Sequence, residues 1–495
     1  MTHPMPTLLR RLLAGVGDAR VSGDLDVLIT SISIDSRRIE RGALFACLHG
    51  LRDDGHAHAA GAVAAGASAV LAERDLDIGT VPLIVVPSVL AALSPIAAQL
   101  WSNPSHALTC VGVTGTNGKT TTTHIVETIA RSAGRAFGLI GTLGARLNDK
   151  FSVDLEHTTP YAHDLQALLA RFRAAGAAGA VLEVSSHALA MHRVDDVEFD
   201  VVALTNITHD HLDFHGNFEE YARTKRRLFE MAQTNRTKRL ATCVLNLDDA
   251  EGRRLAGELP SALTYGVNSS DAALRAINVE LFADGSRFSV PALRPAPFTM
   301  RLPGPFNVAN AMAAIAIATA LDIDVEAIAD GLLSTATVPG RMTQVPAERI
   351  GVYVDYAHTP DGLRNVLQAA RALTEHRVLC VFGCGGDRDP LKRPVMGRIA
   401  RELSDHVVLT SDNPRFEDPQ SIIADVLAGM SGDGATYTVV PDRAAAIENA
   451  IALAEPGDVV VIAGKGHEAY QLVRGERLPF SDVTTAQAAI RKVGA

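Results

Sequence analysis

From residue 108 to the end of the chain, short apolar segments alternate with segments that have helical periodicity. The apolar segments lie at 108–115, 137–142, 180–185, 201–207 and 241–248, and again at 351–358, 377–386, 406–412, 436–442 and 458–466. Alternating strands and helices fold into mostly parallel sheets with helices on both faces. The sequence therefore predicts the α/β fold class.

Breaks in this alternation divide the chain. At roughly 150 residues per domain, a chain of 495 residues holds about three. The helix predicted at 304–321 ends the first series, and Pro339 and Gly340 then interrupt the pattern. Before residue 105, a smaller α/β unit has strand candidates at 43–48 and 67–73. We predict domains at 1–105, 106–337 and 338–495, with a Rossmann-like topology in the last.

Composition excludes several classes of protein. The formal net charge is −10, whereas nucleic-acid-binding proteins carry a basic excess. No apolar run reaches the roughly 20 residues that span a bilayer, and we find no signal peptide. The cysteines are few and odd in number, as expected for buried thiols in a reducing compartment. We expect a cytoplasmic protein, with neither membrane nor nucleic acid as partner, that acts as a monomer.

The strongest local motif is a glycine-rich turn between an apolar strand and an amphipathic helix. Such a turn directs backbone N–H groups at one anion, and a lysine and a hydroxyl there suit phosphates and Mg²⁺. The strict pattern requires glycine at position 113, where this chain has Val113. We predict a variant ATP-binding loop made by Gly115, Thr116, Asn117, Gly118, Lys119, Thr120 and Thr121.

Acidic and imidazole side chains follow two of the predicted strands. Glu183 ends an apolar strand, where a buried carboxylate needs a cation or hydrogen-bond donors, and Mg²⁺ is the obvious partner. Residues 209–215 hold His209, Asp210, His211, Asp213 and His215, which suggests a metal site. A dinuclear zinc hydrolase is the alternative, but its pattern needs histidine where the chain has Phe214.

The helix predicted at 217–232 places a lysine on its apolar face. At 100° per residue, Lys225 falls in the middle of a stripe formed by Phe218, Tyr221, Ala222, Leu228 and Phe229. Burial lowers a lysine's pKa, and the neutral amine can add CO₂ to give a carbamate, a metal ligand. The alternative from spacing alone is that Lys225 pairs with an acid or extends to solvent.

Together these motifs resemble a known family. TGTNGKTT, EVSSHAL, TNITHDHLDFHG, GPFNVANAMAA, VPGRM, DYAHTP and DNPR occur in this order over essentially the whole chain. The chain resembles the Mur ligases of peptidoglycan assembly, in their meso-diaminopimelate-adding form. The resemblance implies an N-terminal domain that binds a UDP-linked substrate, a central ATPase-like domain and a C-terminal domain that delivers the amino acid.

The resemblance also implies cofactors and contacts. Lys225 would be carbamylated and hold a second Mg²⁺ with His211, while Thr120 and Glu183 serve the first. Asn307 and Asn310 would lie beside adenine, with Arg341 and Asp355 at phosphate and ribose. The implied contacts to the UDP-linked substrate are Ile34, Ser36, Leu51, Arg52, Asp53, Thr158, Thr159, Ser185 and Arg193. Where relatives commonly have glutamine, this chain has Met191.

The implied amino-acid pocket is Arg388, Asp412, Asn413, Pro414, Arg415, Gly464 and Glu468. These residues follow separate apolar strands, at the edge where open α/β sheets bind ligands. Arginine matches a carboxylate through two hydrogen bonds, so Arg415 suits the carboxylate that distinguishes diaminopimelate from lysine. The alternative for Arg415 is a structural cap on its loop.

The implied reaction is ATP-dependent amide formation. Lys119 and Mg²⁺ would offset charge while the D-glutamyl carboxylate of UDP-N-acetylmuramoyl-L-alanyl-D-glutamate attacks the γ-phosphate. The amine of meso-diaminopimelate would then displace phosphate from the acyl phosphate. A folylpolyglutamate synthetase is one alternative, although DSR and DNPR disfavour it. An ATP-regulated scaffold without turnover is another, and intact Lys119, Glu183, His211 and Lys225 argue against it.

Overall fold

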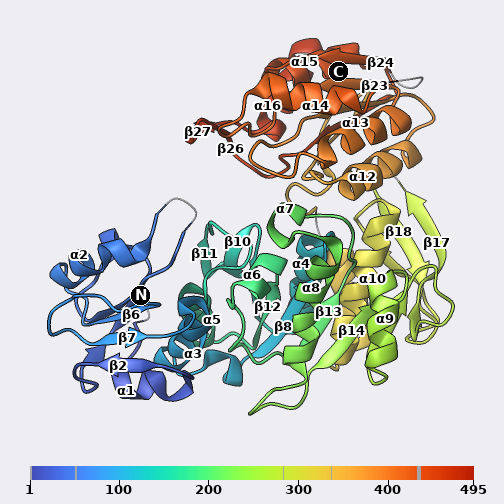
Figure 1. Ribbon diagram of the computed structural model, residues 1–495. Helices are drawn as coiled ribbons and strands as arrows, with labels where there is room; N and C mark the ends of the chain where they lie inside the picture. Colours follow the sequence, from blue (N-terminus) through green and yellow to red (C-terminus); the bar gives the residue numbers. More distant parts are fainter. Residues whose placement is uncertain (1–2, 51–52, 283, 336, 432–435, 495) are drawn as a thin grey trace.

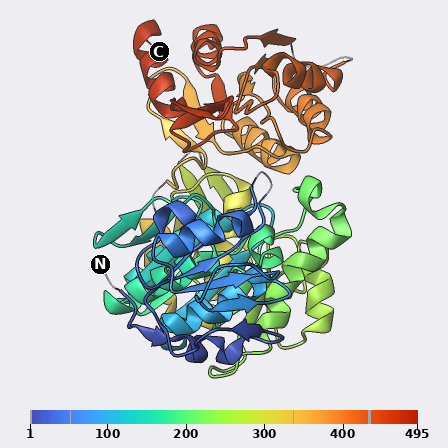
Figure 2. The same cartoon turned by 60° about the vertical axis from the view of Figure 1, so that its left-hand side comes forward.

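The computed structural model describes residues 3–50, 53–282, 284–335, 337–431 and 436–494. Figure 1 shows the N-terminal part in blue, the central part from teal to yellow, and the C-terminal part in orange and red above it. In Figure 2 the N-terminal part lies in front of the central one, and the C-terminal part stays on top. The fold is α/β throughout, as the alternation of apolar segments predicts.

The central sheet places β8 between β12 and β13. Its order is β11-β10-β9-β12-β8-β13-β14-β15-β16, with β10 and β11 antiparallel at one edge and parallel pairing from β9 onward. The strands are β8 (Thr109–Thr114), β9 (Phe137–Gly141), β10 (Gly144–Leu147), β11 (Phe151–Val153), β12 (Gly179–Glu183), β13 (Val201–Leu204), β14 (Thr242–Asn246), β15 (Leu263–Gly266) and β16 (Leu274–Arg275). The loops that follow β8, β12 and β13 therefore meet at one edge of the sheet.

Helices cover both faces of this sheet. The bounds are α4 (Lys119–Ser132), α5 (Ala162–Ala174), α6 (Ser186–Ala190), α7 (Leu212–His215), α8 (Phe218–Ala232), α9 (Ala250–Glu258), α10 (Pro305–Ala320) and α11 (Val325–Ser334). One apolar core packs α4, α10 and α11 against the sheet, and a second packs α5, α8 and α9 against the other face. Helix α10 is mostly alanine, isoleucine and methionine, which suits its burial on nearly all sides.

A small antiparallel sheet extends the central domain. It follows the order β17-β18-β19, with β17 (Ile277–Phe282), β18 (Gly285–Ser289) and β19 (Phe298–Met300). Phe288 and Phe298 join the core that holds α4 and α10. These strands were not predicted from the sequence, because antiparallel strands without helices between them do not follow the strand–helix alternation.

The carboxyl ends of the parallel strands in the C-terminal sheet face the central domain. Its order is β20-β21-β25-β22-β23-β24, parallel except for β20. Its elements are β20 (Thr343–Val345), β21 (Gly351–Asp355), α12 (Pro360–Ala372), β22 (Val378–Phe382), α13 (Lys392–Leu403), β23 (His406–Leu409), α14 (Pro419–Ala428), β24 (Thr436–Val439), α15 (Arg443–Leu453), β25 (Val459–Ala463) and α16 (Asp482–Val493). A hairpin of β26 (Tyr470–Val473) and β27 (Glu476–Pro479) precedes α16. Helices α12 to α14 cover one face, and α15 and α16 the other.

The N-terminal domain contains a smaller sheet of order β2-β7-β6-β5-β4, and β1 pairs with β3. Its elements are β1 (Thr7–Leu8), α1 (Leu9–Leu12), β2 (Arg20–Ser22), β3 (Leu28–Ile29), β4 (Ser31–Ser33), β5 (Ala43–Ala46), α2 (Ala59–Ala64), β6 (Ala69–Ala72), β7 (Leu83–Val85) and α3 (Val89–Leu100). Helices α1 and α3 pack on one face and α2 on the other.

The strands of the N-terminal, central and C-terminal sheets lie within 1–105, 106–337 and 338–495, respectively. Each apolar segment singled out in the sequence contains an observed strand. Cys47, Cys110, Cys243, Cys380 and Cys384 are all buried free thiols. In the part of the chain that the structure describes, no helix combines the length and the apolar character needed to cross a bilayer.

Candidate active site

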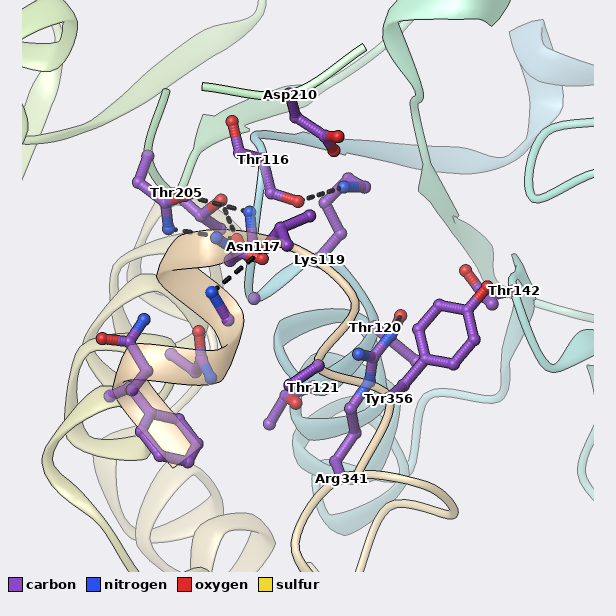
Figure 3. Close-up of a pocket in the computed structure, with 18 of the residues that line it drawn as sticks. Thr116, Asn117, Lys119, Thr120, Thr121, Thr142, Thr205, Asp210, Arg341 and Tyr356 are labelled. Atoms are coloured by element: carbon purple, nitrogen blue, oxygen red, sulfur yellow. Dashed lines mark hydrogen bonds between the residues drawn. The ribbon is translucent and has the colours of Figure 1, made fainter. Parts of the chain in front are cut away.

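The glycine-rich turn between β8 and α4 forms one side of a pocket. Gly115 and Gly118 have φ of 149° and 87°, and a Cβ at either would lie within 2.2 Å of Thr205 or Asn310. Only glycine fits these two positions. The pocket is lined by Thr116, Asn117, Gly118, Lys119, Thr120 and Thr121, whereas Gly115 does not line it. Figure 3 shows these side chains at the start of α4.

The turn is held by Asn206, in the loop that follows β13. The backbone N–H groups of Thr116 and Asn117 donate to the carbonyl and side-chain oxygens of Asn206 at 2.7 and 2.9 Å. Lys119 Nζ donates to the Gly115 and Thr116 carbonyls at 2.8 and 2.9 Å. Burial lowers the pKa of Lys119. The lysine is therefore anchored at the loop, where the start of a helix favours an anion.

Glu183 is a fully buried carboxylate at the carboxyl end of β12. It accepts hydrogen bonds from the Thr120 hydroxyl at 3.0 Å and from Thr142, by its N–H at 2.9 Å and its hydroxyl at 3.1 Å. Thr142 and Thr158 also share a hydroxyl hydrogen bond of 3.2 Å. These hard oxygen atoms line the pocket beside the phosphate loop, which is the donor set that Mg²⁺ prefers.

Lys225 is buried, as the periodicity of its helix predicts, with an exposed fraction of 2%. Its Nζ donates to the Gly115 carbonyl at 2.8 Å and lies 4.8 Å from the centre of the Tyr221 ring. Burial, followed by repulsion from Lys119, lowers its pKa well below the ordinary lysine value. The prediction was wrong for Phe218, which is 42% exposed at the first residue of α8.

His211 lies between this lysine and the C-terminal domain. It has a left-handed φ of 53°, and its Nε2 lies 3.3 Å from Asp210 Oδ2. Burial lowers the pKa of His211, which favours the neutral ring with a free nitrogen lone pair. Among the described residues, no three or more His, Cys, Asp or Glu side chains gather as a metal site, so residues 209–215 do not form the multi-ligand cluster that the sequence suggests.

Helix α10 and the start of the C-terminal domain also line the pocket. Asn310 lines the pocket and donates to Asn307 Oδ1 at 3.1 Å, whereas Asn307 lies behind it and donates to the Pro303 carbonyl. Arg341 donates to the Thr120 hydroxyl at 2.9 Å. Asp355 lines the pocket and accepts from two backbone N–H groups, while burial raises its pKa.

The predicted contacts to the sugar and peptide gather beside Glu183. The Thr159 hydroxyl donates to the Glu183 carbonyl and accepts from the Ser185 N–H. Arg193 donates to the Thr159 carbonyl at 2.8 Å and covers the Tyr161 ring at 4.1 Å from its centre. Its second nitrogen lies 3.1 Å from the Met191 sulfur. Thr158 and Ser185 line the pocket directly.

A second pocket opens at the edge of the C-terminal sheet. It shares Asp210, His211, Tyr356 and His358 with the first pocket, so the two are continuous. Arg388, Asp412, Asn413, Arg415, Gly464 and Glu468 line it, whereas Pro414 does not. The structure thus brings together residues from the loops after β22, β23 and β25, as open α/β sheets do at their binding edge.

Arg415 has an unusual backbone conformation for a side chain of its size. Its φ is 53°. The hairpin holds its backbone on both sides, because the Arg415 N–H donates to the Leu472 carbonyl and the Arg474 N–H donates to the Arg415 carbonyl. Its guanidinium donates to the Gly386 carbonyl at 2.7 Å and remains half-buried in the second pocket. Backbone strain of this kind is retained where surrounding structure fixes a functional residue.

The predicted contacts in the N-terminal domain lie outside both pockets. Ile34 and Ser36 are half-buried next to β4, and Asp53 is exposed and pairs with His58 at 2.9 Å. Leu51 and Arg52 lie outside the described residues. The structure therefore does not bring these uridine-side residues together with the phosphate loop.

Comparison with known proteins decides the family. The family models described as "Mur ligase family, catalytic domain", "Mur ligase middle domain" and "Mur ligase, glutamate ligase domain" match residues 28–99, 113–318 and 340–466. A UDP-N-acetylmuramoyl-L-alanyl-D-glutamate–2,6-diaminopimelate ligase of Syntrophomonas wolfei is 44% identical over 95% of this chain and 96% of its own. The chain belongs to the Mur ligase family.

Two further proteins agree with this assignment. The ligase of the same name from Gloeobacter violaceus is 44% identical over 99% of both chains. A solved structure titled as UDP-N-acetylmuramoyl-L-alanyl-D-glutamate–2,6-diaminopimelate ligase has a TM-score of 0.67 and 32% identity, and covers 99% of this chain and 100% of its own. This Mur ligase therefore has the three-domain architecture of its family.

Sequence reasoning missed several residues at the junction of the two pockets in this Mur ligase. Tyr356 and His358 line both pockets, and the motif DYAHTP contained them without indicating their role. Asn206 holds the phosphate loop, and Lys465 contacts two residues of the second pocket. Glycine on both sides of Lys465 is the only local signal at that position.

Proposed function

We propose that this chain is an ATP-dependent ligase that joins meso-diaminopimelate to the D-glutamyl carboxylate of UDP-N-acetylmuramoyl-L-alanyl-D-glutamate. The observation that carries the proposal is the continuity of the two pockets at Asp210, His211, Tyr356 and His358. A phosphate loop lies on one side of this junction, and a pocket with two arginines lies on the other. Relatives named for this reaction match the full chain.

The residues present fit the Mg²⁺ that such a reaction needs. Glu183 and Thr120 place hard oxygen atoms at the phosphate loop. The carboxylate of Glu183 is buried, and its hydrogen bonds come from the Thr120 hydroxyl and from the N–H and hydroxyl of Thr142, none of which is cationic. Beside them, a second ion would use His211 and Lys225. When bound, Mg²⁺ supplies charge neutralisation for the transferred phosphoryl group.

Lys225 has the surroundings that carbamate formation requires. Burial and the nearby Lys119 favour the neutral amine, whose lone pair can attack CO₂ and release a proton. The product would carry two oxygen atoms in place of an ammonium, next to His211. We propose carbamylated Lys225 as a ligand in the active enzyme.

The chain itself supplies positioning and electrostatic stabilisation. Lys119 and the N–H groups at the start of α4 would bind the ATP phosphates, with Asn310, Arg341 and Asp355 around the rest of the nucleotide. An oxygen of the substrate carboxylate attacks the γ-phosphorus, and ADP leaves with the electrons of the broken bond. The product is an acyl phosphate, which needs no protein nucleophile.

The amino acid then completes the reaction. Its neutral amine attacks the acyl carbonyl, phosphate leaves from the tetrahedral intermediate, and the amine proton passes to solvent or a nearby base. In the second pocket, Arg388 and Arg415 would bind the distal carboxylate of diaminopimelate and Glu468 its ammonium group. Lysine lacks that carboxylate, so it would leave the arginines unpaired.

The remaining parts of the proposal concern the N-terminal domain, the cellular location and the oligomeric state. Ile34, Ser36, Leu51, Arg52 and Asp53 would bind the uridine end of the substrate. Because these residues lie away from both pockets, the extended UDP-linked substrate would reach from there to Glu183 and Arg193. We propose that the enzyme works in the cytoplasm as a monomer.

Release of phosphate tests this function against its alternatives. The purified chain should release phosphate from ATP only when both the UDP-linked dipeptide and diaminopimelate are present, and Lys119→Ala should abolish ATP binding in calorimetry. Phosphate release driven by a folate and glutamate would favour a folylpolyglutamate synthetase. ATP binding without any substrate-dependent turnover would favour a scaffold protein.

A further inference from the structure

Lys465 is a buried cation behind the second pocket. It lies in the turn after β25 and has an exposed fraction of 0%. Its Nζ donates to Glu468 Oε2 at 2.7 Å and to Asn413 Oδ1 at 2.9 Å. A buried ammonium group is costly unless it is paired and hydrogen-bonded, so these contacts fix its position.

The network around Lys465 determines how Asn413 is oriented. Lys465 Nζ and the Leu472 N–H both point at one atom of the Asn413 side chain, each at 2.9 Å. Because both groups can only donate, that atom must be the amide oxygen. The amide nitrogen of Asn413 then donates to Glu468 Oε2 at 2.8 Å. The direction of the amide follows from the lysine and from the hairpin strand β26.

The same network orients Glu468. Lys465 and Asn413 both donate to Oε2, which leaves the lone pairs of Oε1 for a donor in the pocket. Glu468 and Asn413 line the second pocket together with Arg388 and Arg415. The pocket thus contains guanidinium groups that match a carboxylate and one carboxylate oxygen that matches an ammonium group.

We propose that Lys465 is a positioning residue for the amino-acid substrate. It holds Glu468 and Asn413 in a single arrangement, so that Glu468 Oε1 accepts a hydrogen bond from an ammonium group of the incoming diamino acid. Lys465 acts through these two residues and does not touch the substrate. The inference rests on the proposed function, because it assumes that the second pocket binds the amino acid.

Steady-state kinetics of Lys465→Met test the inference. Methionine keeps a similar length and removes the charge and the donors. We expect the KM for diaminopimelate to rise at least tenfold, while the KM values for ATP and the UDP-linked dipeptide stay within twofold of the parent. The control is Lys492→Met, which breaks an exposed 2.9 Å pair with Glu448 in the same domain and should change no KM. A KM for diaminopimelate within twofold of the parent, or an equal rise in all three KM values, overturns the inference.

A double-mutant cycle tests whether Lys465 acts through Glu468. In a Glu468→Gln background, adding Lys465→Met should change the KM for diaminopimelate by less than twofold. A further tenfold rise in that background overturns the proposed route.

Two polar variants cover the case in which Lys465→Met does not fold. Lys465→Arg keeps the positive charge and the hydrogen-bond donors at this position, whereas Lys465→Gln removes the charge. The KM for diaminopimelate should rise at least tenfold in Lys465→Gln and by less in Lys465→Arg, and a folded Lys465→Gln with a KM within twofold of the parent overturns the inference. A parent enzyme that forms no product from diaminopimelate refutes the proposed function itself, whereas an active parent with an unchanged Lys465→Met refutes only the inference.

Discussion

The guanidinium of Arg341 donates a hydrogen bond of 2.9 Å to the hydroxyl of Thr120, across 221 positions of sequence. Arg341 lies just before the first strand of the C-terminal sheet, and Thr120 lies in the first turn of α4. Figure 3 shows Arg341 beside Tyr356, approaching the start of that helix. The C-terminal domain thus contacts the phosphate loop directly, at the cleft where the two pockets are continuous.

Arg341→Met removes this contact and a cation from the nucleotide pocket. Because arginine stabilises charge that develops on a transferred phosphoryl group, we expect kcat/KM for ATP to fall by about 10²-fold or more. The KM for diaminopimelate should stay within twofold of the parent. Initial rates with each substrate varied in turn measure both effects, and an unchanged kcat/KM for ATP would exclude a role at the phosphates.

Glu183→Gln keeps the shape of the side chain and removes its charge. Glutamine is a poor ligand for Mg²⁺, so we expect kcat to fall by about 10²-fold or more and the Mg²⁺ concentration for half-maximal rate to rise. Titration of MgCl₂ at fixed ATP measures this shift. A normal Mg²⁺ dependence in the variant would place the ion elsewhere.

Lys225 makes stability depend on pH in CO₂-free buffer. Its pKa in the folded state lies well below its value of about 10.4 in the unfolded chain, so the unfolded state binds the proton more tightly. The free energy of unfolding therefore rises with pH between these two pKa values. Lys225→Met removes this dependence and should be more stable than the parent at neutral pH, with the difference shrinking towards pH 10. Denaturant unfolding of both proteins in CO₂-free buffer across pH 7–10 measures the difference.

The same lysine gives a direct test of the carbamate. With ¹³C-bicarbonate, the parent should show a carbamate signal by NMR, and Lys225→Met should lack it and lose about 10²-fold or more of kcat. A parent without a carbamate signal but with full activity would contradict the proposed ligand.

Arg415→Ala should lose selectivity for diaminopimelate. Losing one partner of a hydrogen-bonded charge pair costs about 2 kcal/mol or more, so the parent's preference over lysine should fall by about 30-fold or more when the arginine is absent. Competition between the two amino acids at equal concentration, read by mass spectrometry of the products, measures the ratio. Undiminished discrimination would assign Arg415 the structural role of capping its loop through the Gly386 carbonyl.

The parts of the site that the sequence predicts best depend on local pattern. The phosphate loop joins one strand to the next helix, so its glycines and Lys119 can be recognised from neighbouring residues alone. The burial of Lys225 follows from the helical period of its own helix. Phe218 fails the same rule because it is the first residue of α8, where the helix has only begun.

The contacts that sequence could not predict join distant segments. Arg341 meets Thr120 because the central and C-terminal domains face one another at this cleft. Lys465 meets Asn413 because the loops after β25 and β23 lie at the same edge of the C-terminal sheet. The small sheet β17-β18-β19 was also missed, since its antiparallel strands have no helices between them and so do not show the strand–helix alternation. Family resemblance supplied the uridine-side residues such as Ser36, for which local pattern gave no chemical reason.

Ligation assays with each of two amino-acid acceptors, supplied separately, test the central claim most directly. Purified protein is incubated with ATP, Mg²⁺ and UDP-N-acetylmuramoyl-L-alanyl-D-glutamate, with either meso-diaminopimelate or lysine, and ADP and the amide product are both quantified. We predict one ADP per amide with diaminopimelate, and a rate with lysine at least about 30-fold lower. Equal rates with both amino acids, or ADP formation without amide, would contradict the account.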